Sequence, residues 1–156
     1  MIKKVISLIL FVIVCLGLGG IGSVLTYPNI AGWYQGLNKP SWNPPDGVFG
    51  PVWTLLYMMI AIAGWRLWLK RGFHDAPFSW GAYTIQWGLN LGWSFLFFGL
   101  RNPGAALAEI LLLWAAIALT IILFTRQDKG AGALLVPYFL WVSFAVYLNF
   151  SIWRLN

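Results

Sequence analysis

The sequence predicts an all-α membrane protein, a bundle of five transmembrane helices, from two observations. Hydrophobic residues make up 60 % of the 156 residues and charged residues only 9 %, whereas a soluble domain carries about 25 % charge. The apolar residues also fall into five runs, each close to the length of about 20 residues that a helix needs to cross a bilayer. We expect these runs to form one domain over residues 1–156.

The predicted transmembrane spans are residues 5–27, 47–69, 76–100, 103–125 and 130–153. The first run follows two lysines as a signal peptide would, but it stays apolar to Tyr27 without a cleavage site, so we expect a retained helix. Pro77 and Pro103 fall at the first turns of the third and fourth spans, where proline is well tolerated. Pro137 lies inside the fifth span and is expected to bend it.

The connections between the spans differ in length. Those around Arg101 and Asn102 and over residues 127–129 are very short and require antiparallel neighbours in a compact bundle. The connection over residues 28–46 is long and rich in aromatic residues. Because long loops in compact proteins tend to be functional, we expect this one to be a lid.

The basic residues indicate the orientation in the membrane. More of them lie on the side of the N-terminus than on the side of the lid, so the positive-inside rule places the N-terminus in the cytoplasm if the protein is in the cell membrane, which we favour over an outer or organellar membrane. The net charge is +6, but the basic residues form no continuous face. We therefore expect contacts with lipid headgroups and no binding of nucleic acid.

Few residues are suited to catalysis or metal binding. His74 is the only histidine and Cys15 the only cysteine, so we expect neither a metal site nor a catalytic triad. Glu109 is the one acid inside a predicted span. It is either a functional proton or ligand site, or a structural residue that pairs with Arg101 or bonds a neighbouring helix.

The third predicted helix has two contrasting faces. Asn90 belongs to a polar and aromatic face and, if buried, needs a hydrogen-bond partner from another helix or from a ligand. The residues at helical spacing on this face are Tyr83, Gln86, Trp87, Asn90, Ser94 and Phe97. The other face carries Gly81, Gly88, Gly92 and Gly99. Such small residues allow close helix contact, either within the chain or, as we favour, in a homodimer.

Tryptophan is abundant, with 11 residues, and several lie deeper than an interfacial belt would place them. Trp141 in the fifth span is one of these, and it shares a face with Tyr138, Ala145 and Asn149. The second span contributes Trp53 and Tyr57. Aromatic side chains beside a small residue and an amide are typical of a pocket for a flat, apolar ligand with few polar groups.

Three segments together resemble the TspO/MBR family, the tryptophan-rich sensory proteins and translocator proteins (peripheral-type benzodiazepine receptors). They are Trp33-Tyr34-x-x-Leu37-x-Lys39-Pro40-x-Trp42-x-Pro44-Pro45, followed by Trp53 and Tyr57; Asn90-x-x-x-Ser94; and Val136-Pro137-Tyr138-x-x-Trp141. The resemblance runs almost from end to end. One departure is that Phe150 and Ser151 stand where the sterol motif of the animal proteins needs tyrosine, so a sterol ligand is not expected.

The resemblance implies an integral membrane protein, often dimeric, that binds porphyrins and haem-related tetrapyrroles as ligands and needs no cofactor. The ligand-binding residues implied by the resemblance and the aromatic stripes are Trp33, Trp42, Trp53, Tyr57, Asn90, Ser94, Tyr138, Trp141 and Ala145. We expect a sensory or regulatory protein. The alternatives are light- and oxygen-dependent porphyrin degradation, in which Trp53 and Trp141 would act, and transport of a tetrapyrrole or another lipophilic ligand.

Overall fold

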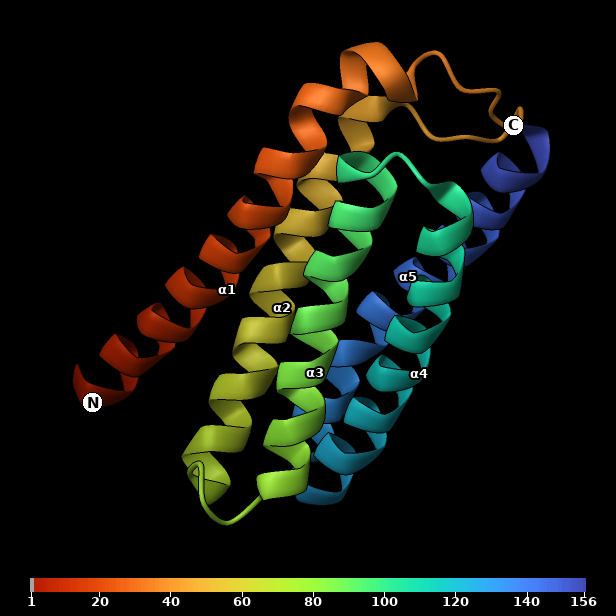
Figure 1. Cartoon of the computed structure of the whole chain (residues 1–156). Helices are drawn as coiled ribbons and strands as arrows, with labels where there is room; N and C mark the ends of the chain where they lie inside the picture. The colour runs from red at the N-terminus through yellow and green to blue at the C-terminus, as the bar shows by residue number, and fades with distance from the viewer. Residues whose placement is uncertain (1) are drawn as a thin grey trace.

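The computed structural model describes residues 2–156, which form a bundle of five helices with no strand (Figure 1). Helix α1 spans Ile2–Asn29 and continues into the π-helical turn η1, Ile30–Tyr34. Helix α2 spans Asp46–Arg71, and helix α3 spans Pro77–Ser94 before the second π-helical turn, η2, Phe95–Gly99. Helices α4 and α5 span Pro103–Gln127 and Lys129–Leu155.

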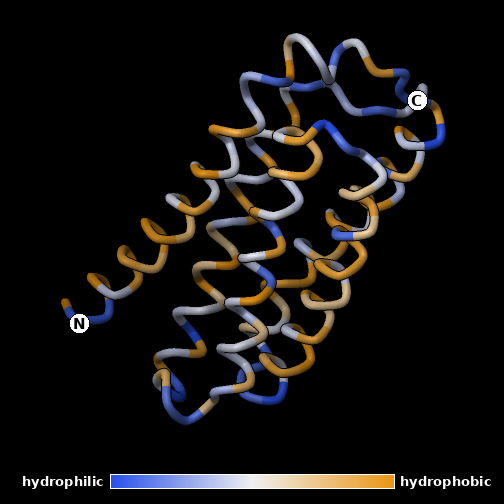
Figure 2. Tube along the Cα trace, viewed as in Figure 1, coloured by the Kyte–Doolittle hydropathy of each residue, from blue (hydrophilic) through white to orange (hydrophobic). Residues whose placement is uncertain are grey.

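Four of the helices are long and apolar enough to cross a membrane. The exception is α3, which is less apolar because it carries Ser79, Gln86 and Asn90, all of them buried inside the bundle. The apolar side chains of α1 are exposed over much of its length, as expected of a helix that faces lipid (Figure 2). The predicted five-helix membrane bundle is therefore confirmed.

The prediction that the lid begins at residue 28 is wrong. Pro28 lies inside α1, and the helical path continues to Tyr34, so the loop covers only residues 35–45. The π-helical turn η1 is closed by the Gln35 N–H, which donates to the carbonyl of Ile30 at 3.1 Å. Packing explains the extension, because Tyr34 is buried against Phe97 and Phe98 of η2, and this contact holds the segment against the bundle.

The short connections place consecutive helices side by side, as predicted. Helix α3 packs on α4, and α4 packs on α5 along most of its length. Helix α5 continues as one helix through Pro137. Arg101, in the connection before α4, adopts a positive φ of 52°, and its guanidinium donates to Oδ1 of Asn29.

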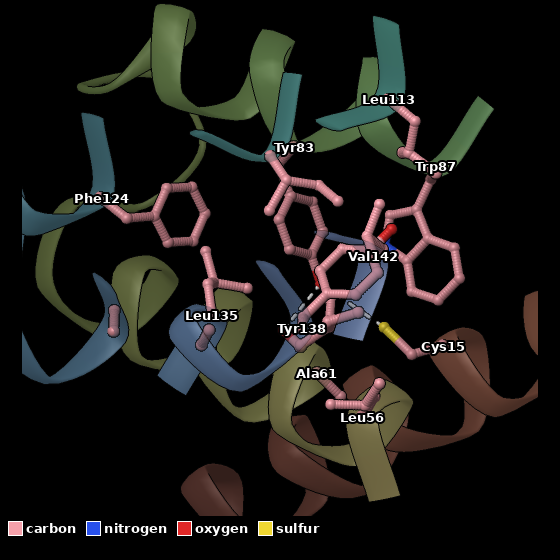
Figure 3. Close-up of a cluster of buried hydrophobic side chains, with 14 of the residues drawn as sticks. Cys15, Leu56, Ala61, Tyr83, Trp87, Leu113, Phe124, Leu135, Tyr138 and Val142 are labelled. Carbon is pink, nitrogen blue, oxygen red and sulfur yellow. Dashed lines mark hydrogen bonds between the residues drawn. The ribbon is translucent and has the colours of Figure 1, made fainter. Parts of the chain in front are cut away.

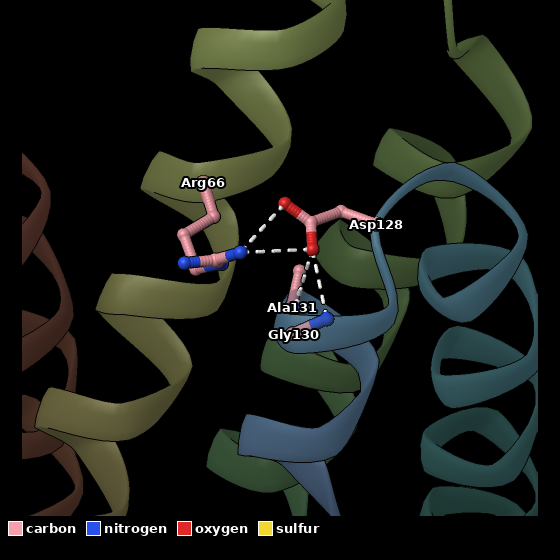
Figure 4. A network of polar contacts seen from close by, with 4 residues as sticks. All are labelled: Arg66, Asp128, Gly130 and Ala131. Carbon is pink, nitrogen blue, oxygen red and sulfur yellow. Dashed lines mark hydrogen bonds and ion pairs between the residues drawn. The ribbon is translucent and has the colours of Figure 1, made fainter.

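A single aspartate ties α2, α4 and α5 together at the end of the bundle opposite the loop. Asp128 Oδ1 accepts from the backbone N–H groups of Gly130 (2.8 Å) and Ala131 (3.2 Å) and so caps α5. Both of its carboxylate oxygens accept from Arg66 of α2 (Figure 4). Partial burial alone would raise the pKa of Asp128, but these hydrogen bonds together hold it below its ordinary value.

The core lies where α2, α3, α4 and α5 meet (Figure 3). It combines aliphatic residues with buried tyrosines, and Tyr83 stacks on Phe124 with ring centroids 5.6 Å apart. Tyr83 also donates to the carbonyl of Ile60. A smaller cluster around Tyr34, Phe97 and Phe98 closes the core at the loop end. The space between the two clusters is the cavity described next.

Candidate ligand-binding cavity

A cavity of about 500 Å³ lies between α1, α2, α3 and α5 at the loop end of the bundle. This volume falls within the range of about 300–1,000 Å³ that is usual for small-molecule sites. Its aromatic lining comes from α1, η1, α2, α3, η2 and α5, and consists of Tyr27, Tyr34, Phe49, Trp53, Tyr57, Trp93, Phe97, Phe98, Trp141 and Phe144. The small residues of α1 on its wall include Gly19, Gly22 and Ser23.

Two indoles, one from α2 and one from α5, form part of the wall. Trp53 of α2 stacks on Tyr57, with ring centroids 5.4 Å apart and an interplanar angle of 30°. Trp141 of α5 packs against Phe49 and Phe144. Ala145 lies one helical turn from Trp141 and leaves space beside it. The wall therefore places several aromatic rings against whatever occupies the cavity.

The floor of the cavity is a chain of hydrogen bonds that links three helices. Tyr57 donates to Oδ1 of Asn90 at 3.1 Å, and Nδ2 of Asn90 donates to the Tyr138 hydroxyl at 3.0 Å. Tyr138 in turn donates to Oε1 of Gln86 at 3.0 Å. The partner that Asn90 requires is thus supplied by neighbouring helices, and the amide remains at the surface of the cavity.

Asn149, another amide on the cavity wall, is held in the same way. Its Oδ1 accepts from the Trp93 indole at 2.9 Å, and its Nδ2 donates to the carbonyl of Pro103 at 2.8 Å. Asn90 and Asn149 are both nine-tenths or more buried. Buried amides of this kind are tolerated in a bilayer only because their polar atoms are hydrogen-bonded.

The loop over residues 35–45 is fastened to α5. Asn38 and Asn156 exchange hydrogen bonds, since the Asn38 N–H donates to Oδ1 of Asn156 (3.0 Å) and Nδ2 of Asn156 donates to the Asn38 carbonyl (2.9 Å). Trp42 stacks on Tyr147 of α5 with ring centroids 4.9 Å apart. Figure 1 shows the loop running across the end of the bundle toward the C-terminus.

Comparison with known proteins agrees with this architecture. The TspO/MBR family model matches residues 11–154. The chain belongs to the TspO/MBR family. It is 48 % identical to the tryptophan-rich protein TspO of Chlorobaculum tepidum, over 99 % of this chain and 98 % of that protein. It is 38 % identical to the human translocator protein, over 87 % of this chain and 82 % of that protein. It is 40 % identical to the tryptophan-rich sensory protein of Cereibacter sphaeroides, over 80 % of this chain and 77 % of that protein.

The structure brings together on the cavity most of the residues expected to bind a ligand in this TspO/MBR protein. These are Trp53, Tyr57, Asn90, Ser94, Trp141 and Ala145. Three others are not on its wall. Trp33 packs on Phe97 and Phe98, Trp42 lies on Tyr147, and Tyr138 is completely buried beneath Asn90.

Sequence reasoning missed several lining residues of the TspO/MBR cavity. Phe49 and Trp93 both contribute to the wall. Trp93 lies three positions after Asn90 and therefore on nearly the same helix face, a spacing that was available in the sequence. Phe49 lies four positions before Trp53, and Phe144 lies three positions after Trp141, so the same helical spacing was available for both of them.

The four glycines, three in α3 and Gly99 at the end of η2, do not share one environment. Gly81 and Gly88 are exposed, and a Cβ at either would meet no atom within 4 Å. A Cβ at Gly99 would contact its own helix at Phe95. At Gly92 it would lie 3.3 Å from Oε1 of Glu109, so this position faces α4. Gly81 and Gly88 are therefore the part of the face that is open to another molecule.

Glu109 has neither of the structural partners considered for it. Its carboxylate oxygens are shielded from solvent and have no hydrogen-bond partner among residues 2–156. Arg101 bonds Asn29 instead. Within the same range, no group of three or more His, Cys, Asp or Glu side chains is placed to hold a metal ion.

Proposed function

We propose that this TspO/MBR membrane protein binds a porphyrin or haem-related tetrapyrrole in the cavity and acts as a sensory or regulatory protein. The observation that supports this most strongly is the pair of indoles, Trp53 and Trp141, on the wall of a cavity of about 500 Å³. Flat aromatic faces favour a flat conjugated ligand, because stacked rings gain energy beyond the apolar area that they bury.

The polar groups of the cavity suit such a ligand. Asn90 lies on the wall with its amide already fixed by Tyr57 and Tyr138. A fixed amide orients a ligand without the entropic cost of ordering a free side chain. A tetrapyrrole carries polar nitrogens at the centre of an apolar ring, so one or two polar contacts among many aromatic ones match its chemistry.

Titration of the purified protein with protoporphyrin tests this proposal. We expect saturable binding, followed by the porphyrin absorbance and by quenching of tryptophan fluorescence. The double variant Trp53→Phe/Trp141→Phe should bind at least about tenfold more weakly, a loss of ~1.4 kcal/mol. The matched control is Trp68→Phe/Trp114→Phe, because neither residue lines the cavity. Equal affinity of all three proteins would contradict the placement.

Light-driven degradation of the bound porphyrin is a second candidate function, supported by the same two indoles. An excited porphyrin would sensitise dioxygen, and Trp53 and Trp141 are the oxidisable side chains that would lie against the ring. Illumination with and without oxygen separates this activity from binding alone. Loss of porphyrin absorbance no faster than that of free porphyrin would leave binding as the function. Transport of a lipophilic ligand is a third candidate, which only a flux assay in vesicles would distinguish.

We also propose that two copies associate through α3. Gly81 and Gly88 are exposed, with open space beyond them, and small residues allow two helix backbones to approach closely in a membrane. A dimer formed here would leave the cavity of each copy open to its ligand, because Gly81 and Gly88 do not line it.

A further inference from the structure

One charged side chain lines the cavity among the residues described, and it is acidic. Asp46 is the first residue of α2, at the point where the loop over residues 35–45 ends. It is half-buried. The chain as a whole carries a net charge of +6. The overall composition would therefore not predict that the charged residue of the cavity is an acid.

The negative charge of Asp46 is not cancelled by a neighbour. Within residues 2–156 its carboxylate takes part in no ion pair, since the pair that is present joins Arg66 to Asp128. Lys39, the cation of the loop, directs its ammonium to the carbonyls of Tyr34 (2.7 Å), Gln35 (3.2 Å) and Leu37 (3.3 Å). Lys39 does not line the cavity.

The position of Asp46 at the start of α2 also makes the cavity less favourable for an anionic ligand. The N-terminus of a helix carries partial positive charge and would otherwise attract an anionic ligand group. Asp46 supplies the negative charge that the N-terminus of α2 favours. The cavity therefore offers an anionic ligand neither a free cationic side chain nor an unopposed helix end.

From these contacts we infer that Asp46 sets the charge selectivity of the cavity and disfavours ligands that bring carboxylates to it. This inference rests on the proposed function. Among tetrapyrroles it predicts a preference for the least acidic ring systems, those with few, esterified or outward-directed carboxylates. A ligand carboxylate near Asp46 would meet a like charge at a half-buried position, where Coulomb repulsion is stronger than in bulk solvent.

The test compares protoporphyrin, a dicarboxylate, with its uncharged dimethyl ester, in the wild-type protein and in Asp46→Asn. For each ligand, the affinity for the variant is compared with the affinity of the same ligand for the wild type. Partitioning of the ligand into detergent therefore cancels. We expect Asp46→Asn to bind the dicarboxylate about tenfold more tightly, which corresponds to ~1.4 kcal/mol, and to bind the ester as the wild type does. Asp46→Ser gives an independent neutral variant.

Two controls define the outcome. Asp46→Glu keeps the charge and should keep the wild-type selectivity. Asp75→Asn removes one negative charge from the far connection and should change neither affinity. Equal changes in the affinities for dicarboxylate and ester, or no change in either, would overturn the inference while leaving the proposed function intact. Failure of the wild-type protein to bind both porphyrins would overturn the proposed function and the inference with it.

Discussion

Asn90 of α3 and Tyr138 of α5 are joined by a hydrogen bond of 3.0 Å beneath the cavity, in which Nδ2 of Asn90 donates to the tyrosine hydroxyl. The same hydroxyl donates to Oε1 of Gln86, so one buried group of α5 satisfies two amides of α3. The chain of contacts reaches Tyr57 of α2 on the cavity wall. The polar floor therefore supports both the bundle and the site.

Replacing Tyr138 by Phe should destabilise the bundle by about 1–3 kcal/mol, the cost of leaving buried polar groups without partners. The Asn90 amide loses its acceptor and Gln86 loses its donor. Thermal unfolding of the detergent-solubilised protein measures the change. Tyr147→Phe is the matched control, because Tyr147 is exposed and its stacking on Trp42 does not need the hydroxyl. Equal melting temperatures for the two variants would contradict this role of Tyr138.

Replacing Gly19 by Ala should weaken ligand binding. A Cβ at Gly19 would overlap the ring of Tyr57, so Tyr57 must move and its bond to Asn90 must lengthen or break. We expect at least about a fivefold loss of protoporphyrin affinity, near 1 kcal/mol. Gly17→Ala on the same helix is the control, since a Cβ there meets no atom within 4 Å. Unchanged affinity in Gly19→Ala would show that the position of Tyr57 does not matter for binding.

Replacing Asp128 by Asn should destabilise the end of the bundle opposite the loop. Loss of a helix cap costs about 0.5–2 kcal/mol, and the contact with Arg66 is lost as well. Because the folded-state pKa of Asp128 is lowered, the contribution of its charge is fully present above the ordinary aspartate pKa of about 3.9 and is lost as the pH falls through the folded-state pKa.

The pH dependence of unfolding checks the sign of this effect. The difference in melting temperature between wild type and Asp128→Asn should be constant near neutral pH and should shrink below about pH 4. A difference that grows on acidification would mean that the charge of Asp128 destabilises the fold.

Replacing Gly88 by Cys should allow a disulfide between two copies in membranes, in a background in which Cys15 is replaced by Ala. The exposed position and the open space at Gly88 make it accessible to a second α3. Leu112→Cys is the control for random collision, because Leu112 is also exposed, on α4. Cross-linking that is absent at Gly88, or no greater than at Leu112, would argue against a dimer through α3.

Patterns within single helices predicted much of the structure. The spacing of Tyr83, Gln86, Trp87 and Asn90 predicted the buried face of α3, and the structure confirms it, since all four are buried. The lengths of the apolar runs predicted the helices to within a few residues. These properties depend on periodicity and length, which the sequence carries directly.

Contacts between distant segments could not be predicted in this way. Pro28 indicated the end of the first helix, but packing of Tyr34 on η2 extends it. A sequence pattern also could not show that Tyr138 would bond Asn90, nor that Trp42 would stack on Tyr147 away from the cavity. These features depend on the rotation of each helix about its axis, which is determined only once the whole bundle has formed.

Protection of a cysteine placed on the cavity wall tests the central claim most directly. In a Cys15→Ala background, Ala145→Cys puts a thiol beside Trp141 on the cavity wall, and Ala133→Cys puts one on the exposed surface of the same helix. The account predicts that protoporphyrin slows labelling of residue 145 by N-ethylmaleimide and leaves residue 133 unaffected. Equal labelling of residue 145 with and without saturating protoporphyrin would contradict a tetrapyrrole site in this cavity.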